Sequence, residues 1–412
     1  MQKKDPFYTV DDTYYDRNYP AALTLYSDDG WRLSAPERYS ISDWFVNLVN
    51  IPQSQILYRI KSHLIFNFLW ASGITALCYI PPDTFAALEL GAPPVFDKLN
   101  LYLPFAMSSG ILGVLLAFRT GQAYDRFWEG RQIWAHVVGR ERSLARCLRY
   151  LEVTPDIRGV AASPPPPLSS STEPSFSSSD SASSEPSSSE PAAAAAAAAT
   201  AAAIMTGDPF VDRFGSWLVA FPVALMQHLR GERSLAAFNY ILDEPDIRFL
   251  EGSDNLPIAC LTALTDLLKV VKTDKAGGAG GGSSSSLLWW QMEEQVTQLM
   301  SYIGEAEAIA GTPVPLAYSR HTSRLLSLWT ILSPIVFLQC LPPLAVPLVT
   351  LILSWMLIGT EEIGHIIEEP FGIHDDRPNI LPLQRYCDIV AKDVREVTQS
   401  RYEARLGPLQ QE

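Results

Sequence analysis

The sequence has few charged residues and lacks the paired residues that most enzymes and metal sites need. Only 18% of its 412 residues are charged, against about 25% in a typical soluble protein. No P-loop, dinucleotide fingerprint or Ser/His/Asp arrangement stands out. Disulfide frameworks and zinc sites are also disfavoured, because the five cysteines are widely spaced without a CxxC pair: Cys78, Cys147, Cys260, Cys340 and Cys387. We therefore expect neither an enzyme nor a bound cofactor.

The overall charge argues against another class of partner. The formal net charge is −14, whereas a protein that binds nucleic acid needs a basic face. We therefore expect no nucleic-acid partner. The acidic balance does not exclude a pore for anions, because the selectivity of a pore depends on the local field and not on the total charge.

Apolar sequence is abundant instead. Hydrophobic residues make up 47% of the chain even though long polar tracts dilute them. Four stretches, at 63–80, 101–118, 325–341 and 344–358, are apolar over lengths at the lower end of what crosses a bilayer. The sequence therefore predicts an all-α membrane protein with four transmembrane helices and a helical soluble domain.

Composition divides the chain into eight parts. Tracts rich in Pro, Ser and Ala or in Gly and Ser cannot build a core, and they separate the helical parts. The expected order is an N-terminal segment (1–60), a first transmembrane hairpin and pore helix with a soluble extension (61–149), a disordered insert (150–206), a soluble helical domain (207–275), a Gly/Ser linker (276–286), soluble helices (287–324), a second transmembrane hairpin (325–360) and a C-terminal soluble segment (361–412). Within the soluble domain, the stretch 212–232 is apolar but short, with charges at both ends, so we expect a buried helix there and not a span.

The stretch 101–131 carries the first functional hypothesis. Gly110, Val114 and Phe118 are four residues apart and share one face of a helix. An arginine-rich segment follows at once, so this helix is a candidate pore wall. The alternative is an ordinary spanning helix whose last turns carry snorkelling anchors. Spacing alone favours the alternative, since stripes of this kind usually reflect packing.

A second motif invites a metal hypothesis. Glu362-x-x-His365 has the spacing found on di-iron helices, and Glu361, Glu368 and Glu369 are nearby. A di-iron site needs a second such pair, and no other histidine has a glutamate three residues before it. We therefore expect no metal, and interpret this region as a solvated acidic helix end after the fourth span.

Four segments together resemble the bestrophin family of anion channels. They are FRTGQAYDRFWEGRQIW at 118–134, AFPVALMQHLRGE at 220–232, GTPVPLAYS at 311–319, and GTEEIGHIIEEPFG at 359–372 followed by LPL at 381–383. They occur in family order and cover most of the ordered chain. The TPVP and EEPFG variants resemble the bacterial and the plant or algal thylakoid members. The acidic calcium-binding belt of animal members is not matched by IHDDRPNILPLQ at 373–384.

The resemblance implies a bestrophin-like homopentamer with one central pore, lined by the second spanning helix. Its hydrophobic neck would be formed by Gly110, Val114 and Phe118, although the family usually has a larger apolar residue at the first position. A lower constriction would fall at Leu287. Chloride and other monovalent anions, with bicarbonate or nitrate as further candidates, would be the partners, and the lipid membrane would be that of the chloroplast thylakoid.

The chemistry of the neck is compatible with this function. A neck of Val and Phe favours ions that lose water easily, and Phe118 can turn the positive edge of its ring toward an anion. Arg119 and Arg126 would either raise the anion concentration at the inner mouth or support the structure. For Arg126 we favour an ion pair with Asp125 or Glu129 of its own or of a neighbouring chain, and for Trp128 we favour packing. A non-conducting membrane scaffold is the alternative function, and a metal-dependent membrane enzyme is the less favoured one.

Overall fold

The computed structural model describes residues 44–49, 51, 54–80, 101–151, 208–273, 284–372 and 380–406. Every regular element within these ranges is a helix, as the predicted all-α class requires. Most of the expected insert at 150–206 and of the Gly/Ser linker at 276–286 lies outside the described residues, as does most of 373–384. Four short helices supplement the long ones: α2 (Trp44–Val49), η4 (Leu235–Tyr240), α9 (Glu244–Glu251) and η5 (Pro343–Ala345).

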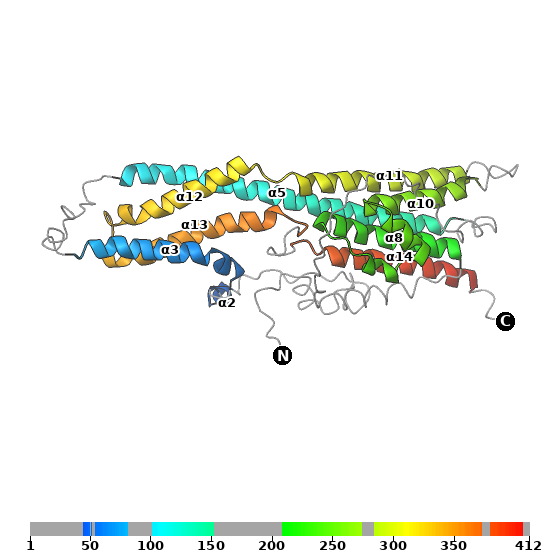
Figure 1. Ribbon diagram of the computed structural model, residues 1–412, viewed down its shortest axis with the longest axis horizontal. Helices are drawn as coiled ribbons and strands as arrows, with labels where there is room; N and C mark the ends of the chain where they lie inside the picture. The colour runs from blue at the N-terminus through cyan, green and yellow to red at the C-terminus, as the bar shows by residue number, and fades with distance from the viewer. Residues whose placement is uncertain are drawn as a thin grey trace, which may run out of the picture.

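The long helices form two bundles, one at each end of an elongated molecule (Figure 1). The first, the apolar-surfaced bundle, contains α3 (Gln55–Leu77), α12 (Leu316–Phe337), α13 (Val346–Glu368) and the first half of α5 (Tyr102–Leu148). The second, the polar-surfaced bundle, contains α8 (Pro209–Arg230), α10 (Leu256–Thr273), α11 (Ser284–Gly311), α14 (Leu383–Leu406) and the second half of α5.

Helix α5 joins the two bundles. It has 47 residues, which corresponds to a length of about 70 Å. Its only proline, Pro104, lies in the first turn, where a missing N–H removes no helical hydrogen bond. The helix packs against α13 and α12 in one bundle and against α11 and α14 in the other. Helix α5 is therefore a single continuous connection between the two bundles.

The polar-surfaced bundle contains the main hydrophobic core, with α8 at its centre. Asp208 caps this helix by accepting the N–H of Phe210, and Gly231 ends it with a φ of 69°. Nearly every face of α8 is buried, including the large side chains of Phe214 and Trp217. The stretch 212–232, for which a buried helix was the expectation, lies here.

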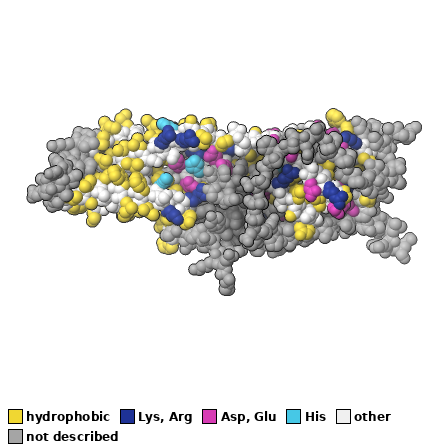
Figure 2. Space-filling view, viewed as in Figure 1, with side chains coloured by type: hydrophobic (Ala, Val, Ile, Leu, Met, Phe, Trp, Pro, Cys, Tyr) yellow, Lys and Arg dark blue, Asp and Glu magenta, His cyan; other side chains and the backbone are white. Residues whose placement is uncertain are grey.

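The apolar-surfaced bundle has only a small core of its own, formed by Leu112, Leu116 and Leu326. Its large apolar side chains lie mostly on the outside, where Figure 2 shows them gathered at one end of the molecule. A soluble protein does not expose such a surface without a partner. The surface is therefore the part of the molecule suited to lipid and to other copies of the chain.

Two described helices are long and apolar enough to cross a membrane, Tyr102–Leu148 and Pro343–Glu368. Only 17% and 22% of their most apolar windows are buried, so neither is the core helix of a soluble protein. The other two expected spans lie on α3 and α12, which do not meet this criterion. Both helices begin with basic residues and contain hydroxyl or amide side chains that lower their mean hydropathy.

Four of the expected domain boundaries fall inside helices. The boundaries at 60/61, 286/287, 324/325 and 360/361 fall inside α3, α11, α12 and α13. A change in surface polarity does not end a helix, because the backbone hydrogen bonds continue wherever residues keep helical geometry. Composition therefore located where the chain passes from apolar to polar surroundings, but it did not locate the ends of the helices.

Candidate pore helix and its anchors

One face of the first half of α5 carries an exposed apolar line. Val114 is 54% exposed and Phe118 is 62% exposed, and Gly110 lies one turn before Val114. Leu103 and Met107 extend the same line toward the start of the helix, both strongly exposed. The structure therefore places the three predicted neck residues together on a face that no part of the described chain covers.

A second line of small residues runs beside the first. Gly113, Ala117 and Gly121 are spaced four residues apart and are exposed. A Cβ atom added at Gly113 or Gly121 would meet no other atom within 4 Å. Small residues of this kind allow the backbones of membrane helices to approach closely. This flank of α5 is therefore shaped for another helix.

Arg119 lies on the opposite side of α5 and is fully buried. Its Nη2 donates to Oε2 of Glu368 at 2.6 Å and lies 3.0 Å from Nδ1 of His365. Its Nε and Nη1 are buried without an acceptor among the described residues. The charge of Arg119 is therefore balanced inside the subunit, and the interpretation of this residue as an exposed charge at the inner mouth is wrong for the subunit itself.

Glu368 connects three elements. Its Oε1 accepts the backbone N–H of Val314 at 3.0 Å, in the connection between α11 and α12, while Oε2 accepts from Arg119 on α5. Glu368 itself is the last residue of α13. A single buried carboxylate therefore holds the pore helix, the end of α13 and the junction between α11 and α12 in one arrangement.

Arg126 reinforces the same junction through backbone acceptors. It donates from Nε to the carbonyl of Glu368, from Nη1 to that of Thr312 and from Nη2 to that of Ile309, at 3.1, 2.5 and 2.7 Å. The expected ion pair of Arg126 with Asp125 or Glu129 does not form within the subunit. The planar guanidinium instead matches three carbonyls near the ends of α11 and α13, a geometry that a carboxylate one helical turn away cannot offer.

The carboxylates of α13 are not a solvated helix end, so that expectation is wrong. Glu361 and Glu368 are 7% and 6% exposed, and Glu362 pairs with Arg59 of α3. These side chains face α3 and α5 because α13 packs between them. In the part of the chain that the structure describes, no group of three His, Cys, Asp or Glu side chains is arranged to hold a metal ion.

Two further predicted site residues lie apart from the junction. Trp128 is half-exposed, so its side chain is not fully packed within one subunit. Leu287 is exposed in the first turn of α11, and that helix begins at the end of the molecule remote from the apolar-surfaced bundle (Figure 1). The predicted neck residues and Leu287 therefore lie in different bundles of the subunit.

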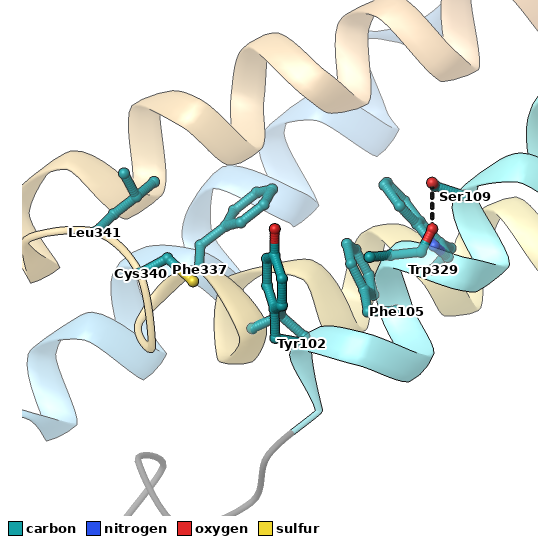
Figure 3. A pocket seen from close by; sticks show the side chains of 9 residues that line it. Tyr102, Phe105, Ser109, Trp329, Phe337, Cys340 and Leu341 are labelled. Carbon is teal, nitrogen blue, oxygen red and sulfur yellow. Dashed lines mark hydrogen bonds between the residues drawn. The ribbon is translucent and has the colours of Figure 1, made fainter.

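Two cavities accompany α5. The first, of about 340 Å³, lies between the start of α5 and the end of α12, and Figure 3 shows its walls of Tyr102, Phe105, Trp329 and Phe337. The ring centroids of Phe105 and Trp329 are 4.0 Å apart, and this cavity offers no charged group. The second, of about 570 Å³, lies between α5 and α11 and has polar walls.

Beyond the spanning part, α5 also carries a buried acid. Glu141 is completely buried in the polar-surfaced bundle, and neither oxygen has a hydrogen-bond partner among the described residues. Burial raises the pKa of Glu141 well above its usual range. Burial and the charge of Glu141 also raise the pKa of the Cys260 thiol on α10. Burial therefore favours the neutral, protonated form of Glu141.

The junction explains residues that sequence reasoning missed. Gly130 lies against the turn at Pro370 and Phe371: a Cβ there would be 3.1 Å from Cγ of Pro370 and 3.2 Å from Cε1 of Phe371. The partners of Arg119 and Arg126 likewise come from the GTPVP and EEPFG segments. The sequence did mark these segments, because they carry the family resemblance. Nothing in the sequence shows that the segments contact one another in the fold.

Comparison with known proteins confirms the resemblance. A family model described as bacterial/fungal bestrophin protein matches residues 37–162 and 197–396. A voltage-dependent anion channel-forming protein of Nostoc sp. is 29% identical over 288 residues, which are 70% of this chain and 75% of that protein. The chloroplastic voltage-dependent chloride channel 2 of Arabidopsis thaliana is 25% identical over 302 residues, 73% of this chain and 57% of that protein.

Solved structures show the same fold. A bacterial bestrophin homolog from Klebsiella pneumoniae superimposes with a TM-score of 0.56 at 21% sequence identity. The match covers 81% of this chain and 98% of that one. Both bundles of the subunit therefore follow a known architecture.

Proposed function

Because the chain belongs to the bestrophin family, we propose that it is an anion channel, formed as a homopentamer around a central pore that α5 lines. The similar proteins from Nostoc and Arabidopsis are named as anion and chloride channels. The observation in this chain that carries the proposal is the exposed apolar line through Gly110, Val114 and Phe118.

The neighbouring line of small residues supports the proposal that the exposed apolar line of α5 faces the pore axis and not lipid. Lipid tails fill space around any apolar side chain, so a lipid-facing helix has no need for Gly113, Ala117 and Gly121 in register. A packed copy of α5 does need them, because they set how closely two backbones approach. With these residues at the contact between copies, Val114 and Phe118 turn toward the common axis.

Selectivity follows from the neck having no charge. An ion that enters it gives up water without gaining an ionic partner, which favours weakly hydrated monovalent anions over strongly hydrated ions. The positive edges of the Phe118 rings then favour anions. Chloride and nitrate are the substrates that this neck suits best, with bicarbonate as a further one. Gly110 makes the outer ring of the neck wider than the rings of Val114 and Phe118.

The remaining residues support the neck. Arg119 and Arg126 are structural anchors that fix α5 to the junction, and Trp128 packs against a neighbouring copy. Leu287 forms a second constriction at the far end of the polar-surfaced bundle. All four helices of the apolar-surfaced bundle cross the membrane, so that the basic starts of α3 and α12 lie at its edge.

The chloroplast thylakoid is the proposed location. The support is that two of the similar Arabidopsis proteins are named as chloroplastic. Fractionation of cells that express the tagged protein tests this point. The tag should be recovered with the thylakoid membranes, and recovery in another membrane fraction overturns the location without affecting the proposed channel function.

Reconstitution into liposomes tests the channel function. Vesicles that contain the wild-type protein should release chloride, and Phe118→Ala should reduce the discrimination between chloride and nitrate in reversal-potential measurements. The control is Ile352→Ala, which shortens an exposed apolar residue of α13 and should leave selectivity unchanged. Absence of any anion flux would favour the non-conducting scaffold. Flux with unaltered selectivity in Phe118→Ala would remove Phe118 from the neck.

A further inference from the structure

On α5 itself, the charges that remain exposed and unpaired beyond the neck are acidic. Arg119 is buried and paired with Glu368, and the three donor groups of Arg126 are occupied by carbonyls. Asp125 and Glu129 are exposed on the same stretch of α5 and form neither a hydrogen bond nor an ion pair with any described residue. The arginine-rich appearance of the sequence therefore conceals an acidic surface.

These two carboxylates continue the line of the neck. Counting from Phe118 in steps of three or four residues, the same face of the helix passes through exposed residues only: Gln122, Asp125, Glu129, Gln132 and His136. At about 1.5 Å per residue, Asp125 lies about 10 Å and Glu129 about 16 Å beyond Phe118 along the axis. If α5 lines the pore, both acids lie on the wall of the inner vestibule.

The cavity between α5 and α11 adds to the negative charge. Glu129, His136, Arg126 and Glu305 all line it, and the imidazole of His136 stacks on Tyr302 with 5.4 Å between ring centroids. Together with Asp125 on the adjoining face of α5, the carboxylates on these two helices outnumber the guanidinium of Arg126. The two helices therefore place an excess of negative charge here, and a ring of subunits multiplies it.

We propose that Asp125 and Glu129 are specificity-determining residues that limit anion entry from the inner side and moderate the preference of the channel for anions. This inference rests on the proposed function. The carboxylates act through their field and not by binding an ion. A surface potential of the order of one kT changes the local anion concentration roughly threefold. The neck then rejects strongly hydrated ions, while the vestibule sets how many anions reach it.

Salt dependence gives this proposal a distinctive signature. The Debye length is about 30 Å at 0.01 M salt and about 3 Å at 1 M. At low salt, Asp125 is therefore well within range of the Phe118 ring, and at high salt it is screened from it. A change in pore shape, by contrast, would alter conductance at both salt concentrations.

The experiment compares wild type, Asp125→Asn, Glu129→Gln and the double variant in planar bilayers at about 0.01 M and about 1 M KCl. Both side chains are exposed and have no hydrogen-bond or ion-pair partner among the described residues, so these substitutions remove charge without removing a contact seen there. The matched control is Asp254→Asn, which neutralises an exposed carboxylate between α9 and α10, outside the α5 face.

The double variant should raise chloride conductance roughly threefold at low salt, with a smaller rise for each single variant and no change at high salt. In a KCl gradient its reversal potential should move toward the chloride equilibrium value. Unchanged low-salt conductance, an equal rise in Asp254→Asn, or a rise that persists at high salt would overturn the proposal. If the wild type passes no anion, the proposed function fails as well. If the wild type conducts anions and the substitutions at Asp125 and Glu129 leave its conductance unchanged, this inference alone fails.

Discussion

Arg119 and Glu368 meet at 2.6 Å although 249 positions separate them in the sequence. The same carboxylate also accepts the backbone N–H of Val314. The contact lies directly beside Phe118, on the side of α5 that faces away from the exposed apolar line. The proposed neck is therefore held from behind by a buried ion pair, and the geometry of the pore depends on a residue that no ion touches.

Removal of the Glu368 charge should destabilise the protein strongly. Glu368→Gln keeps an acceptor for Val314 but leaves the buried Arg119 guanidinium without the carboxylate that pairs with it directly. Breaking a buried pair on one side costs about 3–5 kcal/mol. Thermal unfolding in detergent should show a much lower midpoint than wild type.

Glu362→Gln is the control for this prediction. It breaks the pair with Arg59, whose side chain is 22% exposed, so solvent screens the lost interaction and the cost should be closer to that of a surface pair, about 0–1 kcal/mol. Equal midpoints for the two variants would contradict the role given to Glu368.

Gly130 should tolerate no side chain. A methyl group there would press on the rings of Pro370 and Phe371, and overpacking of this kind costs about 1–3 kcal/mol. Gly130→Ala should therefore lower the unfolding midpoint. Gly139→Ala, two to three turns further along the same helix, meets no atom within 4 Å and should be neutral or stabilising by up to about 1 kcal/mol. The reverse order would refute the packing of α5 against the 370–371 turn.

Glu141 should make stability depend on pH. Its pKa is raised by burial in the folded state, so below the unfolded pKa, near 4.5, the group is neutral in both states and carries no penalty. Above that pH the unfolded chain ionises and the folded chain does not. The free energy of unfolding then falls by about 1.4 kcal/mol per pH unit until the pH reaches the folded pKa.

Glu141→Gln removes this dependence. As the pH rises from 4 through the range above the unfolded pKa, the variant should gain stability relative to wild type, with little difference at pH 4. Unfolding midpoints measured across this range test the prediction. A gap between the two proteins that does not widen with pH would show that Glu141 is ionised or paired in the folded state.

The elements that could be predicted from sequence are those with local signatures. Apolar runs identified all four helices of the apolar-surfaced bundle, and the flanking charges separated the buried α8 from a span. Spacing and resemblance also placed Gly110, Val114 and Phe118 on one face of one helix, as the structure has them, and their role as a neck stays a prediction. What these features share is that neighbours in the sequence determine them.

The junction could not be predicted because its contacts are not local. Asp125 and Glu129 are the nearest carboxylates to Arg126 in sequence, yet carbonyls of three distant residues take its donors. The Glu361–Glu369 region looks hydrophilic, and only the packing of α13 between α3 and α5 shows that Glu361 and Glu368 are buried. The ends of the helices could not be predicted for a related reason. Composition indicates whether a segment lies in apolar or polar surroundings, whereas a helix ends where its backbone hydrogen bonds end.

The measurement that tests the central claim most directly is an electron cryo-microscopy map of the purified protein in a lipid nanodisc. It should show five subunits around one axis, with the Val114 and Phe118 side chains of every subunit directed at that axis and forming its narrowest part. A map in which these side chains point toward lipid, or in which no continuous opening lies between the α5 helices, would contradict the account.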